Sequence, residues 1–175
     1  MNSSKIKQIL KTRTKELAEE PKEDESKGEY LEIIEFVLAY ERYGIESSYV
    51  REVYPLKNFT PIPCTPPFVV GVSNIRGQIL SVLNIKEFFG LPREGLSNLN
   101  RVIIVHMSDM EVGILADAIV GIRMIPPGDI QPSLPTLTDK RAEYLRGVTA
   151  DRLVILDIKK IFSDPNIIVH EEVET

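Results

Sequence analysis

The chain contains an internal repeat, and this repeat limits the possible folds more than any other feature of the sequence. Residues 71–89 read GVSNIRGQILSVLNIKEFF, and residues 147–162 read GVTADRLVILDIKKIF. The matched positions are Gly71 and Gly147, Val72 and Val148, Leu83 and Leu156, Asn84 and Asp157, Ile85 and Ile158, Lys86 and Lys159, and Phe89 and Phe162. Only the first copy contains the triplet Ile75-Arg76-Gly77. The repeat predicts two similar structural units, and the triplet marks where they differ.

A weaker correspondence extends the repeat upstream. Tyr43-Gly44-Ile45 leads to residues 50–53 much as Val112-Gly113-Ile114 leads to residues 119–122. Around these positions, short apolar runs such as LEIIEFVL, VVGVSNI and RVIIVHM alternate with turn signals, which is typical of an all-β sandwich or barrel. Because the pattern occurs twice, we expect two small five-stranded β-barrels with short helices. Units of about 60–70 residues have small cores, so we expect them to pack through an apolar seam.

Local signals predict the connections between these strands. Glu41-Arg42 and Ser108-Asp109 fit tight turns, and Pro126-Pro127-Gly128 ends a strand. Asn84 fits an N-cap for a short helix over residues 85–89, and Asp157 fits the same role in the second copy.

The chain is expected to divide into three parts. The first is a charged helix over residues 4–19 followed by a flexible polar linker, and the last is an acidic tail. We expect the boundaries at residues 1–28, 29–165 and 166–175, with barrel subdomains over about 30–95 and 100–163 that can exchange strands.

Composition opposes several functions. The net charge of −5 and the pI near 5.2 argue against a nucleic-acid-binding protein, although barrels of this size do bind oligonucleotides and this remains a distant alternative. The single cysteine, Cys64, favours a reducing, cytoplasmic compartment. No run approaches the roughly 18 apolar residues that a membrane-spanning helix needs, so direct membrane insertion is not expected.

No catalytic or metal-binding motif is present. HExxH, CxxC, GxSxG and a glycine-rich phosphate loop are all missing, which predicts a non-enzymatic protein without metal or cofactor. His106 is expected to be an ordinary strand residue, and His170 a solvated one. We also expect Glu52 and Asp117 to be solvated charges at strand edges.

Arg76 stands out because it belongs to the inserted triplet and precedes a glycine that permits a tight turn. Two interpretations are equally open from the residues alone: a solvated arginine at a hairpin tip, or an arginine that projects to bind a partner through its planar fork of donors.

The segment Val69–Pro92 closely resembles the signature of the CheW family. It contains the G-V-x-N-x-R-G core, an apolar strand that ends in Asn, and a helix that closes at G-L-P. The upstream run FVLAYERYGIESSYVREVYP and the downstream run YLRGVTADRLVILDIKKIF also match, so the resemblance covers about residues 30–163.

This resemblance implies a mainly β protein of two SH3-like barrels packed side by side. It implies an adaptor without activity of its own, which couples the regulatory domain of a CheA-type histidine kinase to the cytoplasmic tips of chemoreceptors at the inner face of the membrane. It also allows assembly into rings with the kinase. The domain sequence does not separate chemotaxis from a non-flagellar pathway such as surface motility or pili.

The resemblance also implies a set of receptor- or kinase-binding residues. Arg76 falls on the signature arginine, and Ile119 and Ile122 align with a groove between the barrels that would accept a receptor helix. The complete set is Arg76, Asn74, Gly77, Val50, Glu52, Val53, Ile119 and Ile122.

Overall fold

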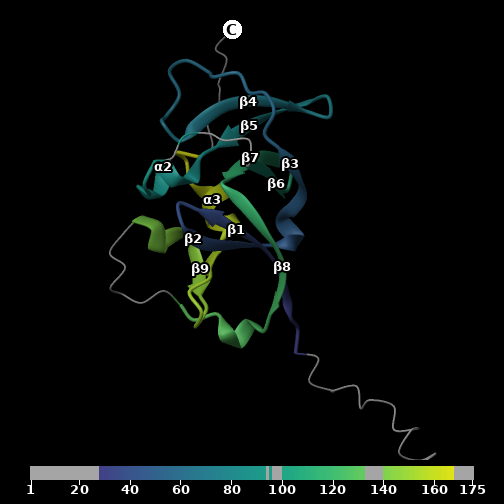
Figure 1. The fold of residues 1–175 in the computed structure, drawn as a ribbon, viewed down its shortest axis with the longest axis vertical. Helices are drawn as coiled ribbons and strands as arrows, with labels where there is room; N and C mark the ends of the chain where they lie inside the picture. Colours follow the sequence, from purple (N-terminus) through teal and green to yellow (C-terminus); the bar gives the residue numbers. More distant parts are fainter. Residues whose placement is uncertain (1–27, 94, 96–99, 133–139, 168–175) are drawn as a thin grey trace, which may run out of the picture.

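Two five-stranded β-sheets form the fold in the computed structural model, which describes residues 28–93, 95, 100–132 and 140–167 (Figure 1). One sheet has the order β8-β1-β2-β10-β9, and the other has the order β3-β6-β7-β5-β4. The first sheet consists of β8 (Ala118–Ile125), β1 (Leu31–Leu38), β2 (Glu41–Glu46), β10 (Val154–Leu156) and β9 (Leu145–Val148). The second consists of β3 (Val50–Pro55), β6 (Arg101–Met107), β7 (Met110–Ala116), β5 (Gln78–Leu83) and β4 (Val69–Ile75).

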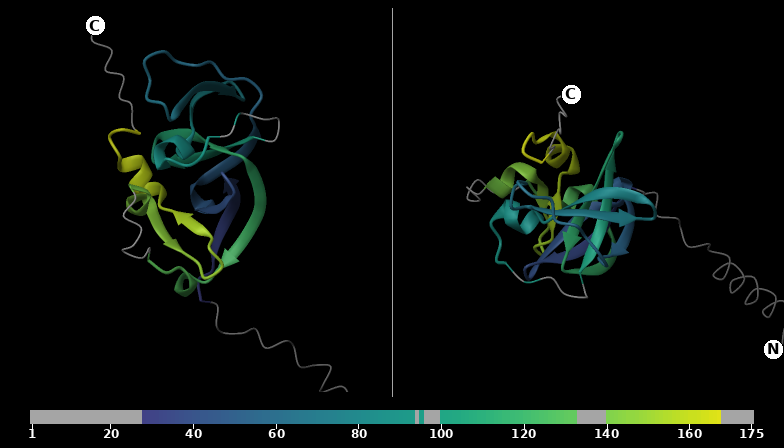
Figure 2. Two further views of the ribbon diagram at one scale, coloured as in Figure 1. Left: turned by 60° about the vertical axis from the view of Figure 1, so that its left-hand side comes forward. Right: turned by 90° about the horizontal axis from the view of Figure 1, so that it is seen from above.

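Short helices connect these strands. They are η1 (Ser47–Tyr49), α2 (Ile85–Phe89), η2 (Pro127–Asp129), η3 (Lys140–Tyr144) and α3 (Ile158–Ser163). The predicted fold class, mainly β with two SH3-like five-stranded units, is confirmed. In the left view of Figure 2, the teal β4–β5 hairpin lies above, the yellow-green β9 and β10 lie below, and the long green β8 runs along the side. The helix predicted over residues 4–19 lies outside the described residues.

Each sheet takes strands from both halves of the chain. The hairpin β1–β2 joins the sheet of β8, β9 and β10, while the hairpin β6–β7 joins the sheet of β3, β4 and β5. The two sheets therefore have the same topology, with the hairpins exchanged between the repeats. Sheet membership therefore does not follow a simple boundary near residues 95–100. The chain crosses between the sheets at η1 and again at Asp117.

The two segments of the weaker upstream repeat occupy equivalent positions in the two sheets. Gly44 on β2 pairs in parallel with Ile155 on β10, and Gly113 on β7 pairs in parallel with Val82 on β5. A Cβ atom on Gly44 would meet Ile33 Cγ2 at 2.5 Å, and one on Gly113 would meet a valine Cγ1 at 2.4 Å. Both positions therefore require glycine because a side chain fills the space above them.

The Gly-Val pairs that begin the two main repeats also allow a close approach of another segment. Val72 pairs with Thr60 and Val148 pairs with Gln131 in isolated antiparallel bridges, each beside a repeat glycine. A Cβ atom on Gly71 would lie 2.2 Å from Thr60 O, and one on Gly147 would lie 2.4 Å from Gln131 O. The shared Gly-Val pair thus lets a loop backbone approach each sheet closely.

The largest apolar cluster lies between the sheets. It corresponds to the apolar seam that the sequence predicted. The first sheet contributes Phe36, Leu38, Tyr43 and Ile45, and the second contributes Ile103, Val105, Ile114 and Ala116. Each sheet also encloses a small cluster of its own: Ile75, Leu80, Val82, Val102, Ile104 and Leu115 in one, and Ile33, Ile125, Leu153 and Ile155 in the other. Most of the described buried apolar residues belong to this shared cluster, so neither sheet contains the main core alone.

Asp117 is not the solvated strand-edge charge that the sequence suggested. It lies at the crossover between β7 and β8, and its Oδ1 atom is 2.6 Å from Nζ of Lys86 on α2, whose side chain is only 3% exposed. The Asp117 Oδ2 atom accepts a hydrogen bond from the Ala39 backbone N–H at 2.8 Å. The side chain of Asn100 also donates to Asp117 Oδ1, at 3.4 Å. This carboxylate therefore links a helix, a hairpin turn and the crossover.

The helix caps and most turns follow the sequence prediction. Asn84 caps α2 and accepts a hydrogen bond from the Lys86 backbone N–H, and Asp157 caps α3 in the same way through Lys160 N. One prediction was wrong: Glu41-Arg42 begins β2, and the turn lies at Ala39-Tyr40, where both residues have positive φ. Neither residue type favours this conformation, and the hydrogen bond from Ala39 to Asp117 helps to hold it.

Within the described part of the chain, no helix is long and apolar enough to cross a membrane.

Candidate functional site

The hairpin between β4 and β5 carries the inserted triplet. Ile75 pairs with Gln78, which leaves Arg76 and Gly77 as a two-residue turn. Both have positive φ, 53° and 85°, as a type I′ hairpin turn requires. The Asn74 Oδ1 atom accepts a hydrogen bond from the Gly77 backbone N–H at 2.9 Å. The turn places the Arg76 side chain at the tip of the hairpin, where 69% of it is exposed.

Glu52 on β3 binds this arginine. Arg76 Nε lies 3.1 Å from Glu52 Oε2, and Arg51 Nε lies 4.0 Å from Glu52 Oε1. Strands β3 and β4 form opposite edges of one sheet, so the Arg76–Glu52 ion pair connects those two sides. Glu52 is an ion-pair partner with 20% of its side chain exposed, and not the solvated charge expected from the sequence. The structure thus brings together Arg76, Asn74, Gly77 and Glu52.

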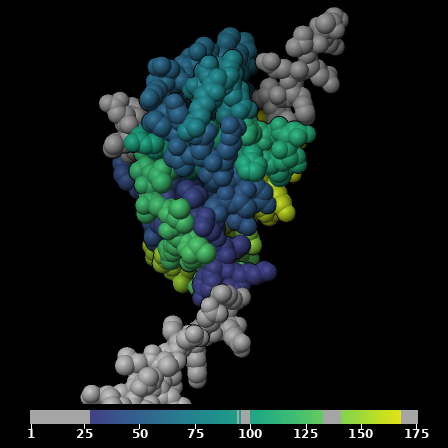
Figure 3. Space-filling view, turned by 90° about the vertical axis from the view of Figure 1, so that its right-hand side faces the viewer, coloured from purple at the N-terminus to yellow at the C-terminus, as the bar shows by residue number. Residues whose placement is uncertain are grey.

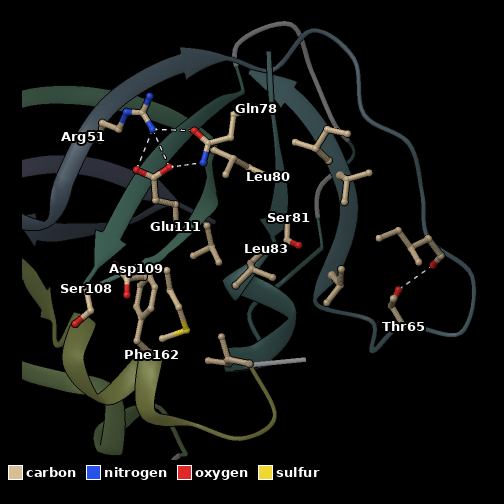
Figure 4. Close-up of a pocket in the computed structure, with 17 residues that line it drawn as sticks. Arg51, Thr65, Gln78, Leu80, Ser81, Leu83, Ser108, Asp109, Glu111 and Phe162 are labelled. Atoms are coloured by element: carbon tan, nitrogen blue, oxygen red, sulfur yellow. Dashed lines mark hydrogen bonds and ion pairs between the residues drawn. The ribbon is translucent and has the colours of Figure 1, made fainter. Parts of the chain in front are cut away.

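A second polar group joins the same elements. Glu111 on β7 accepts hydrogen bonds from Arg51 on β3 and from Gln78 at the start of β5 (Figure 4). The hydrogen bond from Arg51 is the main reason that the pKa of Glu111 lies below its ordinary value, with desolvation opposing it and Gln78 adding to it. These three residues line a cavity of about 840 Å³, together with apolar residues such as Leu83 and Phe162.

An apolar stripe runs along β8, the edge strand of the other sheet. Ile122 is 67% exposed, and its neighbours Val120 and Met124 are 56% and 54% exposed. The three residues alternate with less exposed positions, as expected for one face of a strand. Figure 3 shows the green atoms of β8 on the same face of the molecule as the blue atoms of β3.

The remaining predicted residues divide between this surface and the core. Val50 and Ile119 are partly buried and pack against the cluster between the sheets. Val53 on β3 is 37% exposed. Ile119 and Ile122 belong to a different sheet from Arg76, so the predicted residues form two surfaces: the hairpin turn with Glu52, and the β8 stripe.

Sequence reasoning missed five residues that these surfaces include: Val120, Met124, Arg51, Gln78 and Glu111. The alternation of apolar residues in AIVGIRMI could have indicated the first two, because Val120, Ile122 and Met124 are spaced by two. No local pattern marks the polar group, whose members come from β3, β5 and β7.

The second copy of the repeat has a different arrangement at the equivalent hairpin. Arg123 on β8 lies 2.7 Å from Asp151 in the β9–β10 connection. The hydrogen bonds from Arg123 and then from Thr149 hold the pKa of Asp151 well below its usual range. In both sheets an ion pair therefore connects the edge strand to a hairpin, and the β9–β10 connection also carries an exposed arginine with positive φ, Arg152.

Comparisons with known proteins give one consistent family. The family model described as the CheW-like domain matches residues 32–166. The chemotaxis protein CheW of Treponema pallidum (strain Nichols) is 32% identical over 142 residues, which cover 77% of this chain and 84% of that protein. Protein FrzA of Myxococcus xanthus is 36% identical over 107 residues, which cover 61% of this chain and 66% of that protein.

A solved structure gives the same result. The crystal structure of the scaffolding protein TtCheW from Thermoanaerobacter tengcongensis aligns with a TM-score of 0.67 and 32% sequence identity. The alignment covers 73% of this chain and 88% of that chain.

Proposed function

Because the chain belongs to the CheW-like domain family, we propose that it is a scaffold that couples chemoreceptors to a CheA-type histidine kinase in chemotaxis. The observation that carries this proposal is the family match over residues 32–166, which spans both sheets and the hairpin with Arg76. The protein works without catalysis, by holding the receptor tips and the regulatory domain of the kinase close together at the inner face of the membrane. Assembly into rings with the kinase belongs to the same proposal.

Two surfaces supply the contacts. The β8 stripe offers exposed apolar side chains to the apolar face of a receptor helix, as in helix-in-groove recognition. The Arg76 turn offers a planar guanidinium on a hairpin held by Asn74 and Glu52, which favours an acidic or carbonyl-rich partner surface. Ile119 on β8 and Val50 on β3 pack against the cluster between the sheets, and Val53 on β3 is 37% exposed.

Direct binding tests this function. The intact protein is mixed separately with the regulatory domain of a CheA-type kinase and with a chemoreceptor tip fragment, and each complex is measured by pull-down and calorimetry. We expect binding to both. A protein that bound neither would not be an adaptor of this kind, and salt-dependent binding to single-stranded DNA instead would favour the nucleic-acid alternative.

A second candidate is the same coupling role in a non-flagellar chemosensory pathway. The observation that favours it is the relative of 36% identity that carries the name Protein FrzA, which does not mention chemotaxis. Deletion of the gene would separate the two: loss of swimming chemotaxis supports the first output, and loss of surface motility alone supports the second.

Ile122→Glu is expected to weaken binding of the receptor tip at least about tenfold, equivalent to about 1.4 kcal/mol. The glutamate would place a charge at the centre of the apolar stripe, which an apolar helix face would have to desolvate. Stability should change by less than about 0.5 kcal/mol, because Ile122 is 67% exposed. Ile119 is a poorer choice, since it packs against the core.

Tyr40→Glu provides the control for this variant. Tyr40 is 84% exposed on the turn between β1 and β2, near the start of β8 and several positions along β1 from Ile34, which pairs with Ile122, and it receives the same charge. Calorimetry should give an unchanged affinity for Tyr40→Glu. Equal affinities for Ile122→Glu and the wild type would remove the stripe from the receptor contact.

A further inference from the structure

We propose that Arg51, Gln78 and Glu111 form a positioning network that fixes the Arg76 turn in the orientation that binds a partner. The inference rests on the proposed function and deepens it, because it assigns a role to residues that do not themselves touch the partner.

The three side chains form a closed set of hydrogen bonds (Figure 4). Arg51 Nη1 donates to Glu111 Oε1 at 2.9 Å and to Glu111 Oε2 at 2.7 Å. Gln78 Nε2 donates to Glu111 Oε2 at 2.8 Å, and Gln78 Oε1 accepts from Arg51 Nη1 at 3.0 Å. Each member contacts the other two, so the position of one side chain constrains the others.

The network is attached to both sides of the turn. Gln78 follows the turn residues directly and begins β5, while Glu52, the neighbour of Arg51, binds Arg76 itself. The pairing of β3 with β6 shifts register between Val50 and Glu52, as a β-bulge does. A bulge redirects side chains, which explains how adjacent residues of one strand reach two points on the same hairpin.

The β4–β5 hairpin of the first repeat is longer than the β9–β10 hairpin of the second, and the two hairpins are held differently. Strands β4 and β5 have seven and six residues, whereas β9 and β10 have four and three. The β9–β10 hairpin, whose strands are shorter, is held by the direct Arg123–Asp151 ion pair. In the longer β4–β5 hairpin, Glu111 on β7 accepts a hydrogen bond from Gln78, the residue that follows the turn directly.

A purely stabilising role does not explain this arrangement. The Arg51 side chain is 42% exposed and the Glu111 side chain 20% exposed, and ion pairs this open to solvent contribute little to folding. Ordering a long arginine before binding, in contrast, removes part of the entropy cost of ordering it in the complex. The network is therefore suited to preorganisation of the turn.

Glu111→Gln tests the proposal in the intact protein. The amide keeps the shape of the side chain but loses the charge and one of the two oxygen acceptors. We expect an unchanged fold, faster motion of the Arg76 and Gly77 amides in ¹⁵N relaxation, and an affinity for the receptor tip that falls three- to tenfold. In an Arg76→Ala background the same substitution should cause no further loss of affinity.

Glu46→Gln is the matched control. Glu46 Oε2 lies 2.6 Å from Arg146 Nη1 in the other sheet, with similar exposure of both side chains. This variant should leave the Gly77 amide and the affinity unchanged. Unchanged relaxation of Gly77 in Glu111→Gln, or an equal loss of affinity when Arg76 is already absent, would overturn the positioning role.

Failure of the proposed function has a different signature. If the Arg76→Ala variant bound the receptor tip as tightly as the wild type, Arg76 would not contact the receptor. The relaxation of Gly77 in Glu111→Gln would still decide whether the network orders the turn.

Discussion

Asp117→Ala is expected to lower the free energy of unfolding by about 3–5 kcal/mol, which is the usual cost of removing one partner from a buried ion pair. The Lys86 side chain is 3% exposed and would lose the carboxylate that lies 2.6 Å away. The turn residue Ala39 would lose its hydrogen bond to Asp117 as well. Because Asp117 lies where the chain crosses between the sheets, the loss should affect the whole fold and not one hairpin.

Chemical denaturation followed by circular dichroism measures this effect. Lys159→Met is the control, because Lys159 is the repeat equivalent of Lys86 but is exposed, and we expect a change below about 0.5 kcal/mol. The double variant Lys86→Met/Asp117→Asn should recover part of the loss, since no buried charge then remains. A decrease below about 1 kcal/mol for Asp117→Ala would show that the ion pair does not stabilise the crossover.

Arg76→Ala is expected to abolish receptor control of the kinase while leaving the fold intact. The side chain is 69% exposed and its ion pair with Glu52 should contribute no more than about 1 kcal/mol to stability. Loss of the guanidinium removes the planar donors that the turn presents to a partner. We expect a decrease of at least about tenfold in receptor-dependent kinase activation, equivalent to about 1.4 kcal/mol of coupling.

Receptor-controlled autophosphorylation of the kinase, measured with purified components, gives this result directly. Arg93→Ala is the control, because Arg93 is 77% exposed and forms a comparable ion pair with Glu87 at 2.8 Å, outside the turn. Arg76→Lys should restore part of the coupling, since it keeps the charge without the planar fork. Full receptor control by Arg76→Ala would remove the turn from the coupling surface.

The repeat predicted local structure well because local structure depends on residues close in sequence. Asn84 and Asp157 cap helices in equivalent places, and Arg76 lies on a type I′ turn, as their neighbours indicated. The turn at Ala39-Tyr40 was placed wrongly because neither residue favours positive φ, and contacts from distant segments decide its position.

The sequence did not determine which sheet each strand would join. A repeat identifies equivalent segments, but the exchange of the hairpins β1–β2 and β6–β7 depends on packing between segments far apart in the chain. Contacts such as Lys86 with Asp117 leave no periodic signal, and the polar group around Glu111 comes from three strands. The exposed side of β8 was only partly identified, because an apolar strand residue is normally buried.

We expect this protein to make kinase activity depend on the receptor. The most direct test combines a CheA-type kinase, chemoreceptor tip fragments and the purified protein, and measures kinase autophosphorylation with each component omitted in turn. We expect receptor-dependent activity only when all three components are present, and its loss with Arg76→Ala. Receptor control that is the same without the protein, or absent when all three are present, would contradict the account.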